Sequence, residues 1–231
     1  MKLCGLQKTT LLDYPGHVAA TIFLGGCNFR CPFCHNSGLI GSDAASLFSE
    51  EEIIDFLIKR KGILEGVCIT GGEPTLAVEL ESFIRRIREL GYLIKLDTNG
   101  YRPDVLKKLI TEGLLDYIAM DIKSGREHYK KAAGTGDLII KNVEESAAFL
   151  MENRIPYEFR TTVVKGIHTI GDFVDIGNWL EGDSPYFLQN YVDSDQVLCP
   201  GYTSFSESEL KAFLKILKPF LPGATLRGES F

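Results

Sequence analysis

The chain has 231 residues, of which 45% are hydrophobic, 24% charged and 10% aromatic, a composition typical of a globular protein with a substantial core. Its formal net charge of −6 argues against a general nucleic-acid-binding surface. No apolar run approaches the roughly 20 residues of a membrane span, and the first residues lack the apolar core of a secretory signal. We therefore expect a cytoplasmic protein with reduced cysteines and with neither a nucleic acid nor a membrane as partner.

Strand-like and helix-like segments alternate along the chain. The apolar run at residues 18–24 is the first expected strand, and further strands are expected at residues 67–70, 92–96, 115–120, 157–164 and 186–188. Capping-box patterns mark the starts of two helices, with Ser49 and Glu52 in the first and Ser206 and Glu209 in the second. Helices are expected from residue 49 and at residues 77–90, 103–112, 137–153, 169–180 and 206–217, with a short extended piece after residue 219.

This alternation predicts the fold class. Parallel neighbours in a sheet need a crossover connection, so six strands separated by helices imply an α/β fold with mostly parallel strands. Because only six strand–helix units are expected, they should form a partial, open (β/α)6 barrel. The sequence contains no repeat, low-complexity tract or linker, which predicts a single domain over residues 1–231.

A loop at residues 25–36 follows the first strand and holds Cys27, Cys31 and Cys34 with the spacing C-x3-C-x2-C. Three thiolates on one short loop suit a soft metal or an iron–sulfur cluster. A structural zinc site is closed by four ligands, whereas three thiolates on a four-iron cluster leave one iron open to another ligand. Two alternatives stay open: a zinc site that uses His35 as fourth ligand, and a disulfide, which would need an oxidising compartment.

Polar and glycine-rich segments follow the other strands. Because the C-terminal ends of parallel strands share one edge of the sheet, we expect these segments to form one rim. Alone, Asp97 could be a turn former, Lys123 a solvated lysine and Arg160 a structural ion-pair partner; their occurrence at successive strand ends predicts a site. The segments are Gly71-Gly72-Glu73-Pro74, Asp97-Thr98-Asn99-Gly100, Asp121-Ile122-Lys123, Val164-Lys165-Gly166 and Gln189-Asn190-Tyr191.

The set of motifs resembles the radical S-adenosylmethionine (SAM) superfamily. The cysteine loop, Phe33 before its last cysteine and the Gly-Gly-Glu-Pro segment carry this likeness. Within the superfamily the chain is similar to the activating enzymes of glycyl radical enzymes, and most of all to the short type that activates anaerobic ribonucleoside-triphosphate reductase. The motifs that carry this closer likeness are Leu12-Asp13-Tyr14-Pro15-Gly16, Cys34-His35-Asn36, Asp97-Thr98-Asn99-Gly100, Met120-Asp121-Ile122-Lys123 and residues 159–164.

The resemblance implies a 4Fe–4S cluster on the three loop cysteines and SAM as a second cofactor. Gly71 and Gly72 would let a backbone approach the methionine end of SAM, Glu73 would accept from its amine or brace the turn, and Lys123 would suit its carboxylate. The remaining implied SAM contacts are Phe33, Asp97, Thr98, Asp121 and Arg160, and a monovalent cation is expected near Asp97, Thr98, Met120 and Asp121. No catalytic residue beyond the cluster ligands is implied, and no histidine matches the one that related enzymes carry near the sixth strand.

The implied activity is the reductive cleavage of SAM followed by formation of a glycyl radical on a partner protein, an anaerobic ribonucleoside-triphosphate reductase. A one-electron donor such as flavodoxin or ferredoxin is also implied. The alternatives are an activase of another glycyl radical enzyme, of the pyruvate formate-lyase type, and a non-catalytic zinc or cluster-binding module. A radical enzyme that acts on a small molecule, such as the deazapurine-forming type, is disfavoured because its cluster loop has a different spacing.

Overall fold

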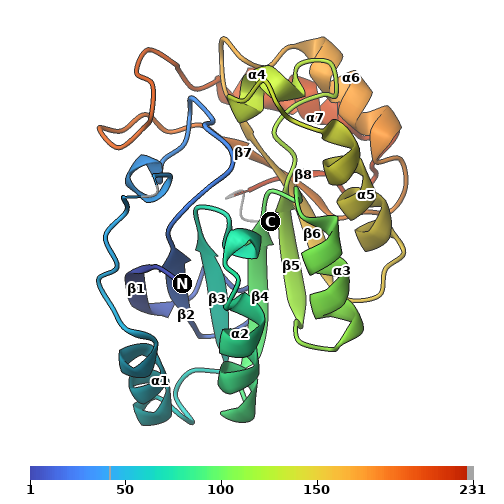
Figure 1. Ribbon diagram of the computed structural model, residues 1–231. Coiled ribbons are helices and arrows are strands. Elements are labelled where there is room, and N and C mark those ends of the chain that lie inside the picture. Colours follow the sequence, from blue (N-terminus) through green and yellow to red (C-terminus); the bar gives the residue numbers. More distant parts are fainter. Residues whose placement is uncertain (42, 228–231) are drawn as a thin grey trace.

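The computed structural model describes residues 1–41 and 43–227, and its strands form one curved sheet (Figure 1). The strands are β1 (Leu3–Thr10), β2 (Ala19–Leu24), β3 (Gly66–Gly71), β4 (Leu93–Thr98), β5 (Tyr117–Asp121), β6 (Tyr157–Val163), β7 (Tyr186–Asn190) and β8 (Thr225–Leu226). They lie in the order of the sequence, from β1 to β8, and every neighbouring pair is parallel except β1 and β2. The prediction of an α/β, partial and open barrel with mostly parallel strands is confirmed.

Two strands extend the sheet beyond the six expected ones. β8 is the short extended piece expected after residue 219, and it pairs with β7. β1 was not expected, because its Gln7-Lys8-Thr9 stretch is exposed and shows no apolar alternation. It is an edge strand that pairs antiparallel with β2, with one isolated bridge from Leu3 to Phe48, and such a strand does not need the apolar pattern of a central one.

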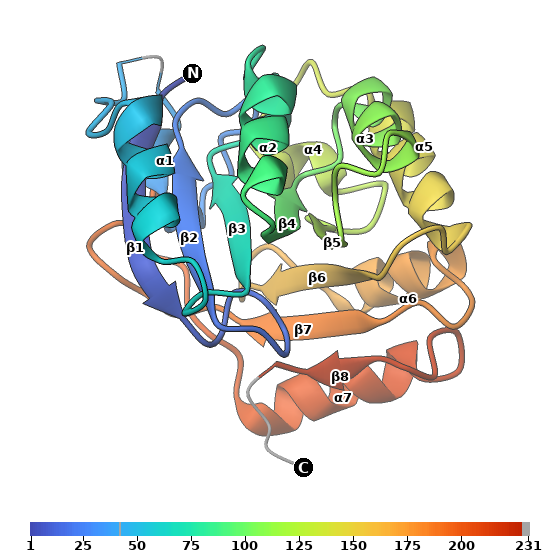
Figure 2. The same cartoon turned by 90° about the horizontal axis from the view of Figure 1, so that it is seen from below.

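Figures 1 and 2 show the helices on the outer side of the curved sheet. The capping boxes at Ser49 and Ser206 are both formed, and Thr169 begins a third. The helix expected from residue 77 begins at Leu80, because Pro74–Leu76 forms a 3-10 turn first. The helices are α1 (Glu50–Lys59), α2 (Leu80–Glu89), α3 (Pro103–Thr111), the unexpected short α4 (Tyr129–Ala133), α5 (Ile140–Met151), α6 (Ile170–Trp179) and α7 (Glu207–Leu217).

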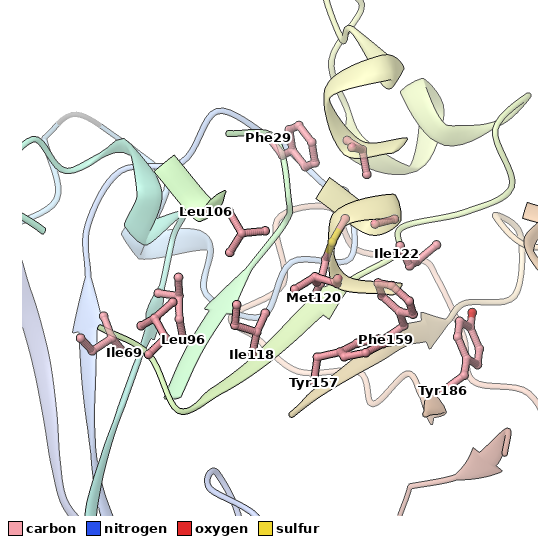
Figure 3. Close-up of a cluster of buried hydrophobic side chains, with 14 of the residues drawn as sticks. Phe29, Ile69, Leu96, Leu106, Ile118, Met120, Ile122, Tyr157, Phe159 and Tyr186 are labelled. Carbon is pink, nitrogen blue, oxygen red and sulfur yellow. The ribbon is translucent and has the colours of Figure 1, made fainter. Parts of the chain in front are cut away.

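The two faces of the sheet differ in character. Leu96, Ile118, Met120 and Phe159 belong to the hydrophobic core shown in Figure 3. Side chains alternate between faces along a strand, so their neighbours in sequence point toward the inside of the open barrel. Apart from Ala119, these neighbours carry polar groups, and Lys95 and Glu158 are both buried there. Among residues 1–41 and 43–227, no helix is long and apolar enough to cross a membrane.

Candidate functional site

A pocket lies at the C-terminal edge of the parallel strands, between the cysteine loop and the C-terminal ends of β3 to β7. Every residue predicted as a cluster ligand or SAM contact lines it except Glu73. Met120, expected beside a cation, is buried in the core instead. The segment Val164-Lys165-Gly166, expected at the rim, does not line the pocket, because Val164 is buried and Lys165 pairs with Glu209. The sheet order explains this convergence, because adjacent parallel strands all end at the same rim. Asn99 and Gln189, from two of the expected rim segments, also line the pocket, together with Phe29, His35, Asn36, Ile40, Thr70 and Thr162.

Contacts at both ends fix the cysteine loop. Backbone hydrogen bonds join Gly26 N to Leu39 O at 2.7 Å and Arg30 N to Ala133 O at 2.8 Å. The later part of the loop is hydrogen-bonded to residues 198–199, through Leu198 N to Cys34 O at 3.2 Å and Cys199 N to Pro32 O at 2.9 Å. The loop is therefore held by segments from three different parts of the chain.

The loop thiols are held in a desolvated environment. Burial raises the pKa of Cys27 to about 11 and that of Cys31 to about 12, and it also raises the pKa of Cys34. Metal binding must therefore displace protons from these thiols. All six cysteines are free, so no disulfide forms. Three thiols that border an open pocket fit a 4Fe–4S cluster with one iron left for another ligand.

The zinc interpretation needs His35 as the fourth ligand. His35 Nε2 lies 2.5 Å from the carbonyl oxygen of Val192, which occupies one of the two ring nitrogens that could bind a metal. Within the described part of the chain, no three His, Cys, Asp or Glu side chains gather closely enough to hold a single metal ion.

Gly71 and Gly72 are glycines because two backbones meet there. Gly71 has a φ of +116°, and a Cβ on it would lie 2.3 Å from Leu24 O. A Cβ on Gly72 would lie 2.1 Å from Gly26 O, in the cysteine loop. The two loops are joined by hydrogen bonds from Gly72 N to Leu24 O and from Glu73 N to Gly26 O, both 2.8 Å. These glycines therefore position the cysteine loop, besides leaving room in the pocket.

Gly72→Ala should destabilise the fold by about 1–3 kcal/mol, the usual range for overpacking, and lower the iron content after reconstitution. The added methyl group collides with backbone rather than with a flexible side chain, so the cysteine loop must move. Urea unfolding and iron and sulfide analysis measure the two effects. Gly38→Ala is the matched control, because a Cβ there meets nothing within 4 Å. Equal stability and equal iron content of the two variants would show that the close approach at Gly72 does not position the cysteine loop.

Glu73 braces the turn rather than lining the pocket. Its Oε1 accepts from Thr98 Oγ1 at 2.7 Å and from both the backbone and the side chain of Thr75, and its Oε2 accepts from Asn99 N at 2.6 Å. The side chain is buried, which raises its pKa, while these hydrogen bonds favour the carboxylate. Of the two roles expected for Glu73, the structure shows the one that joins the turn after β3 to the end of β4.

Glu73→Gln should therefore cost about 1–3 kcal/mol of stability, because an amide cannot accept hydrogen bonds at both of its ends and leaves a buried donor unpaired. Urea unfolding of the protein without cofactors measures this. Glu89→Gln, at the exposed end of α2, is the control and should unfold like the parent protein. A Glu73→Gln variant as stable as this control would show that the hydrogen bonds contribute nothing.

Charged side chains of both signs also line the pocket. Arg160 links two strand ends, since its Nη1 lies 3.3 Å from Asp97 Oδ2 and its Nη2 lies 2.9 Å from Asp121 Oδ1. Lys123 Nζ lies 3.0 Å from Asp121 Oδ2, and Lys95 is ion-paired with Asp97. Burial alone would raise the pKa of Asp121, but Arg160 and Lys123 outweigh it and lower that pKa to about 2.

Sequence reasoning missed two residues that support this rim. Lys95 is two residues before Asp97 in β4, so strand alternation places both on the inner face, a signal that could have been used. His168 follows β6; its Nε2 donates to Lys123 O at 2.8 Å, and its ring lies 6.2 Å from that of Phe33, edge to face. Of the segment after β7, only Gln189 lines the pocket, while Asn190 bonds Phe205 O and Tyr191 bonds Asp193.

His168 should make the fold sensitive to mild acid. Its Nδ1 accepts from Val164 N at 3.0 Å, and burial lowers its pKa. The unfolded chain takes up a proton near pH 6.5 that the folded chain resists, so the free energy of unfolding should fall below that pH, by at most about 1.4 kcal/mol per pH unit. Urea unfolding between pH 7.5 and 5.5 checks this. His168→Gln should flatten the profile while His17→Gln should not, and an unchanged slope would exclude His168 as its source.

Residues 21–180 match the sequence profile of the radical SAM superfamily. The chain belongs to this superfamily and is a radical SAM enzyme. It is 31% identical to a Methanocaldococcus jannaschii protein named "Putative glycyl-radical enzyme activating enzyme", over 96% of this chain and 94% of that protein. It is 32% identical to a "Probable GTP 3',8-cyclase" of Thermococcus kodakarensis, over 62% of this chain and 46% of that protein.

The fold is also similar to that of SuiB from Streptococcus suis, solved with bound S-adenosylmethionine. The TM-score is 0.67 at 13% identity, over 90% of this chain and 52% of SuiB. The chain thus spans about half the length of SuiB, and at this identity the likeness concerns the fold alone.

Proposed function

We propose that this chain activates a glycyl radical enzyme, and that its client is an anaerobic ribonucleoside-triphosphate reductase. The observation that carries the proposal is the convergence of a three-cysteine loop and a charged rim on one pocket. Its support from relatives is the likeness to the M. jannaschii protein, which runs over nearly the full length of both chains. In this proposal residues 1–231 form a single radical SAM domain.

In this proposal Cys27, Cys31 and Cys34, which line the pocket, would hold a 4Fe–4S cluster. When bound, this cluster would supply the one-electron chemistry: with an electron from a flavodoxin or ferredoxin, SAM would be cleaved to methionine and a 5′-deoxyadenosyl radical, and that radical would take a hydrogen atom from a glycine of the client. The chain itself binds and orients the cluster and SAM and excludes water from the pocket. No side chain has to act as a general base.

The rim residues hold SAM. Lys123 Nζ is the cation that reaches the pocket next to the loop cysteines, so it binds the methionyl carboxylate. The backbones of Gly71 and Gly72 lie against the amine end, and Phe33 packs beside the cysteines. Asp97, Thr98, Asp121 and Arg160 also line the pocket. We leave out a monovalent cation near Asp97, Thr98, Met120 and Asp121, because the carboxylate oxygens there already have cationic partners.

A second candidate is an activase of another glycyl radical enzyme, of the pyruvate formate-lyase type. The site described above would serve both, since it concerns SAM rather than the client. A third is a small-molecule radical enzyme, favoured by the partial likeness to the GTP 3',8-cyclase. These candidates differ in where the hydrogen atom comes from.

Isotope transfer distinguishes them. Reconstituted, reduced protein is mixed with SAM and with a reductase made in medium containing glycine deuterated at the α-carbon. The proposal expects one deuterium in each 5′-deoxyadenosine formed. Deuterium transfer from a labelled pyruvate formate-lyase but not from the reductase would show that the client is the pyruvate formate-lyase type of enzyme. Unlabelled 5′-deoxyadenosine with both proteins, and deuterium transfer from a labelled nucleotide, would contradict glycyl radical activation.

A further inference from the structure

Lys95 is a buried charge at the base of the rim. It lies in the middle of β4, between β3 and β5, and only 2% of its side chain is exposed. Its ammonium group is ion-paired with Asp97 Oδ1 and lies 3.8 Å from Cys68 Sγ. Burying a lysine ammonium group lowers the stability of a fold unless the charge is paired. In Lys95 the partner is Asp97, so the question is what this buried pair does at the rim.

The carboxylate oxygens of the rim are all engaged by fixed cations. Asp97 Oδ1 is paired with Lys95, and Asp97 Oδ2 with Arg160 at 3.3 Å. Asp121 Oδ1 accepts from Arg160 Nε and Nη2, both at 2.9 Å, and Asp121 Oδ2 pairs with Lys123 at 3.0 Å. An alkali-metal ion needs several oxygen ligands, and here it would have to displace a tethered cation from each oxygen that it used.

The net charge of the rim also disfavours an alkali-metal ion there. Two carboxylates face three cationic side chains, so the group carries a formal excess of one positive charge before any ligand binds. That excess suits the carboxylate of a bound amino-acid group. A further cation among these residues would be opposed by Lys95 and Arg160 at short range.

We propose that the Lys95 ammonium group is a built-in monovalent cation, which takes the place of an alkali-metal ion beside Asp97 and Asp121. Lys95 does not line the pocket among the residues described there. It acts through Asp97, as a positioning residue that holds this carboxylate and, through Arg160, the Asp121 carboxylate in place. Because the ammonium is tethered to a central strand, its occupancy does not depend on the salt in solution, so the site should be indifferent to Na⁺ and K⁺.

The first test uses the protein without cluster or SAM, and it is independent of the proposed function. Melting temperatures are compared in KCl, NaCl and choline chloride at equal ionic strength. The parent protein should melt at the same temperature in all three. Lys95→Met, which keeps the length of the side chain and removes its charge, should be stabilised by K⁺ or Na⁺ over choline. Lys95→Arg should behave like the parent, and Lys107→Met, which removes a surface lysine of α3, is the control for loss of any lysine.

The second test measures SAM binding to the reconstituted protein by equilibrium dialysis, and this part rests on the proposed function. The parent should bind with the same Kd in the three salts, within about twofold, and Lys95→Met should bind about tenfold more weakly in choline and recover in K⁺ or Na⁺. Alkali dependence of the parent in either test would overturn the inference, even if Lys95→Met does not fold. A folded Lys95→Met variant whose melting temperature and Kd for SAM are the same in KCl, NaCl and choline chloride would also overturn it. Failure of every variant to bind SAM would reject the proposed function and leave the melting test to decide on Lys95.

Discussion

Cys31→Ser is expected to give a folded protein that neither assembles a 4Fe–4S cluster nor cleaves SAM above background. Cys31 is the most buried of the three loop cysteines, with 7% of the residue exposed, and it lies between the other two in sequence. A hydroxyl is a poor ligand for the soft iron–sulfur site, and two thiolates leave the cluster with too few protein ligands. Cluster assembly and SAM cleavage should therefore both be lost completely rather than partly.

The measurements are iron and sulfide content after anaerobic reconstitution, and 5′-deoxyadenosine formed after reduction. Cys199→Ser is the matched control, because Cys199 is exposed and contacts the cysteine loop through its backbone. It should retain both cluster and cleavage. A Cys31→Ser variant with normal iron content and cleavage would show that the three-cysteine assignment is wrong.

Lys123→Met should raise the Kd for SAM by about 10–100-fold, because a hydrogen bond to a charged group contributes about 1.5–3 kcal/mol. Lys123 is held next to Asp121, which raises its pKa, so it stays charged at every working pH. Its removal also leaves Asp121 with Arg160 as its sole cationic partner among the ion pairs described. The iron content should not change, because Lys123 is not a cluster ligand.

Equilibrium dialysis with the reconstituted protein measures this Kd. Lys130→Met, on the exposed side of α4, removes a lysine of the same segment of the chain and should bind SAM like the parent. If Lys123→Met matched this control, the carboxylate of SAM would have to be bound elsewhere in the pocket.

The sequence was sufficient to predict the rim, because the argument needed only strand ends. Apolar runs located β2 to β7. Because these strands are parallel and adjacent, their C-terminal ends bring Cys27, Asp97 and Lys123 to one pocket, and no knowledge of the loop conformations was needed. β1 was missed because an edge strand that is half exposed carries no apolar pattern. α4 was missed because it has only five residues, too few for a helical period to show.

Pairing between side chains could not be predicted in the same way. The resemblance implied a monovalent cation beside Asp97 and Asp121, the carboxylates at two neighbouring strand ends, but it did not show how the cationic side chains of this chain pair with them. Arg160 bridges both carboxylates and Lys95 is paired with one, but a sequence does not show which charges meet. The two roles of Glu73 were likewise separated only by its hydrogen bonds to Thr98 and Asn99.

The most direct test of the central claim is electron paramagnetic resonance of the reduced, reconstituted protein mixed anaerobically with SAM and an anaerobic ribonucleoside-triphosphate reductase. A glycyl radical doublet should form, it should require all three components, and it should disappear with Cys31→Ser. If SAM is cleaved at a normal rate but neither this reductase nor a pyruvate formate-lyase acquires the doublet, the claim that this chain activates a glycyl radical enzyme is wrong.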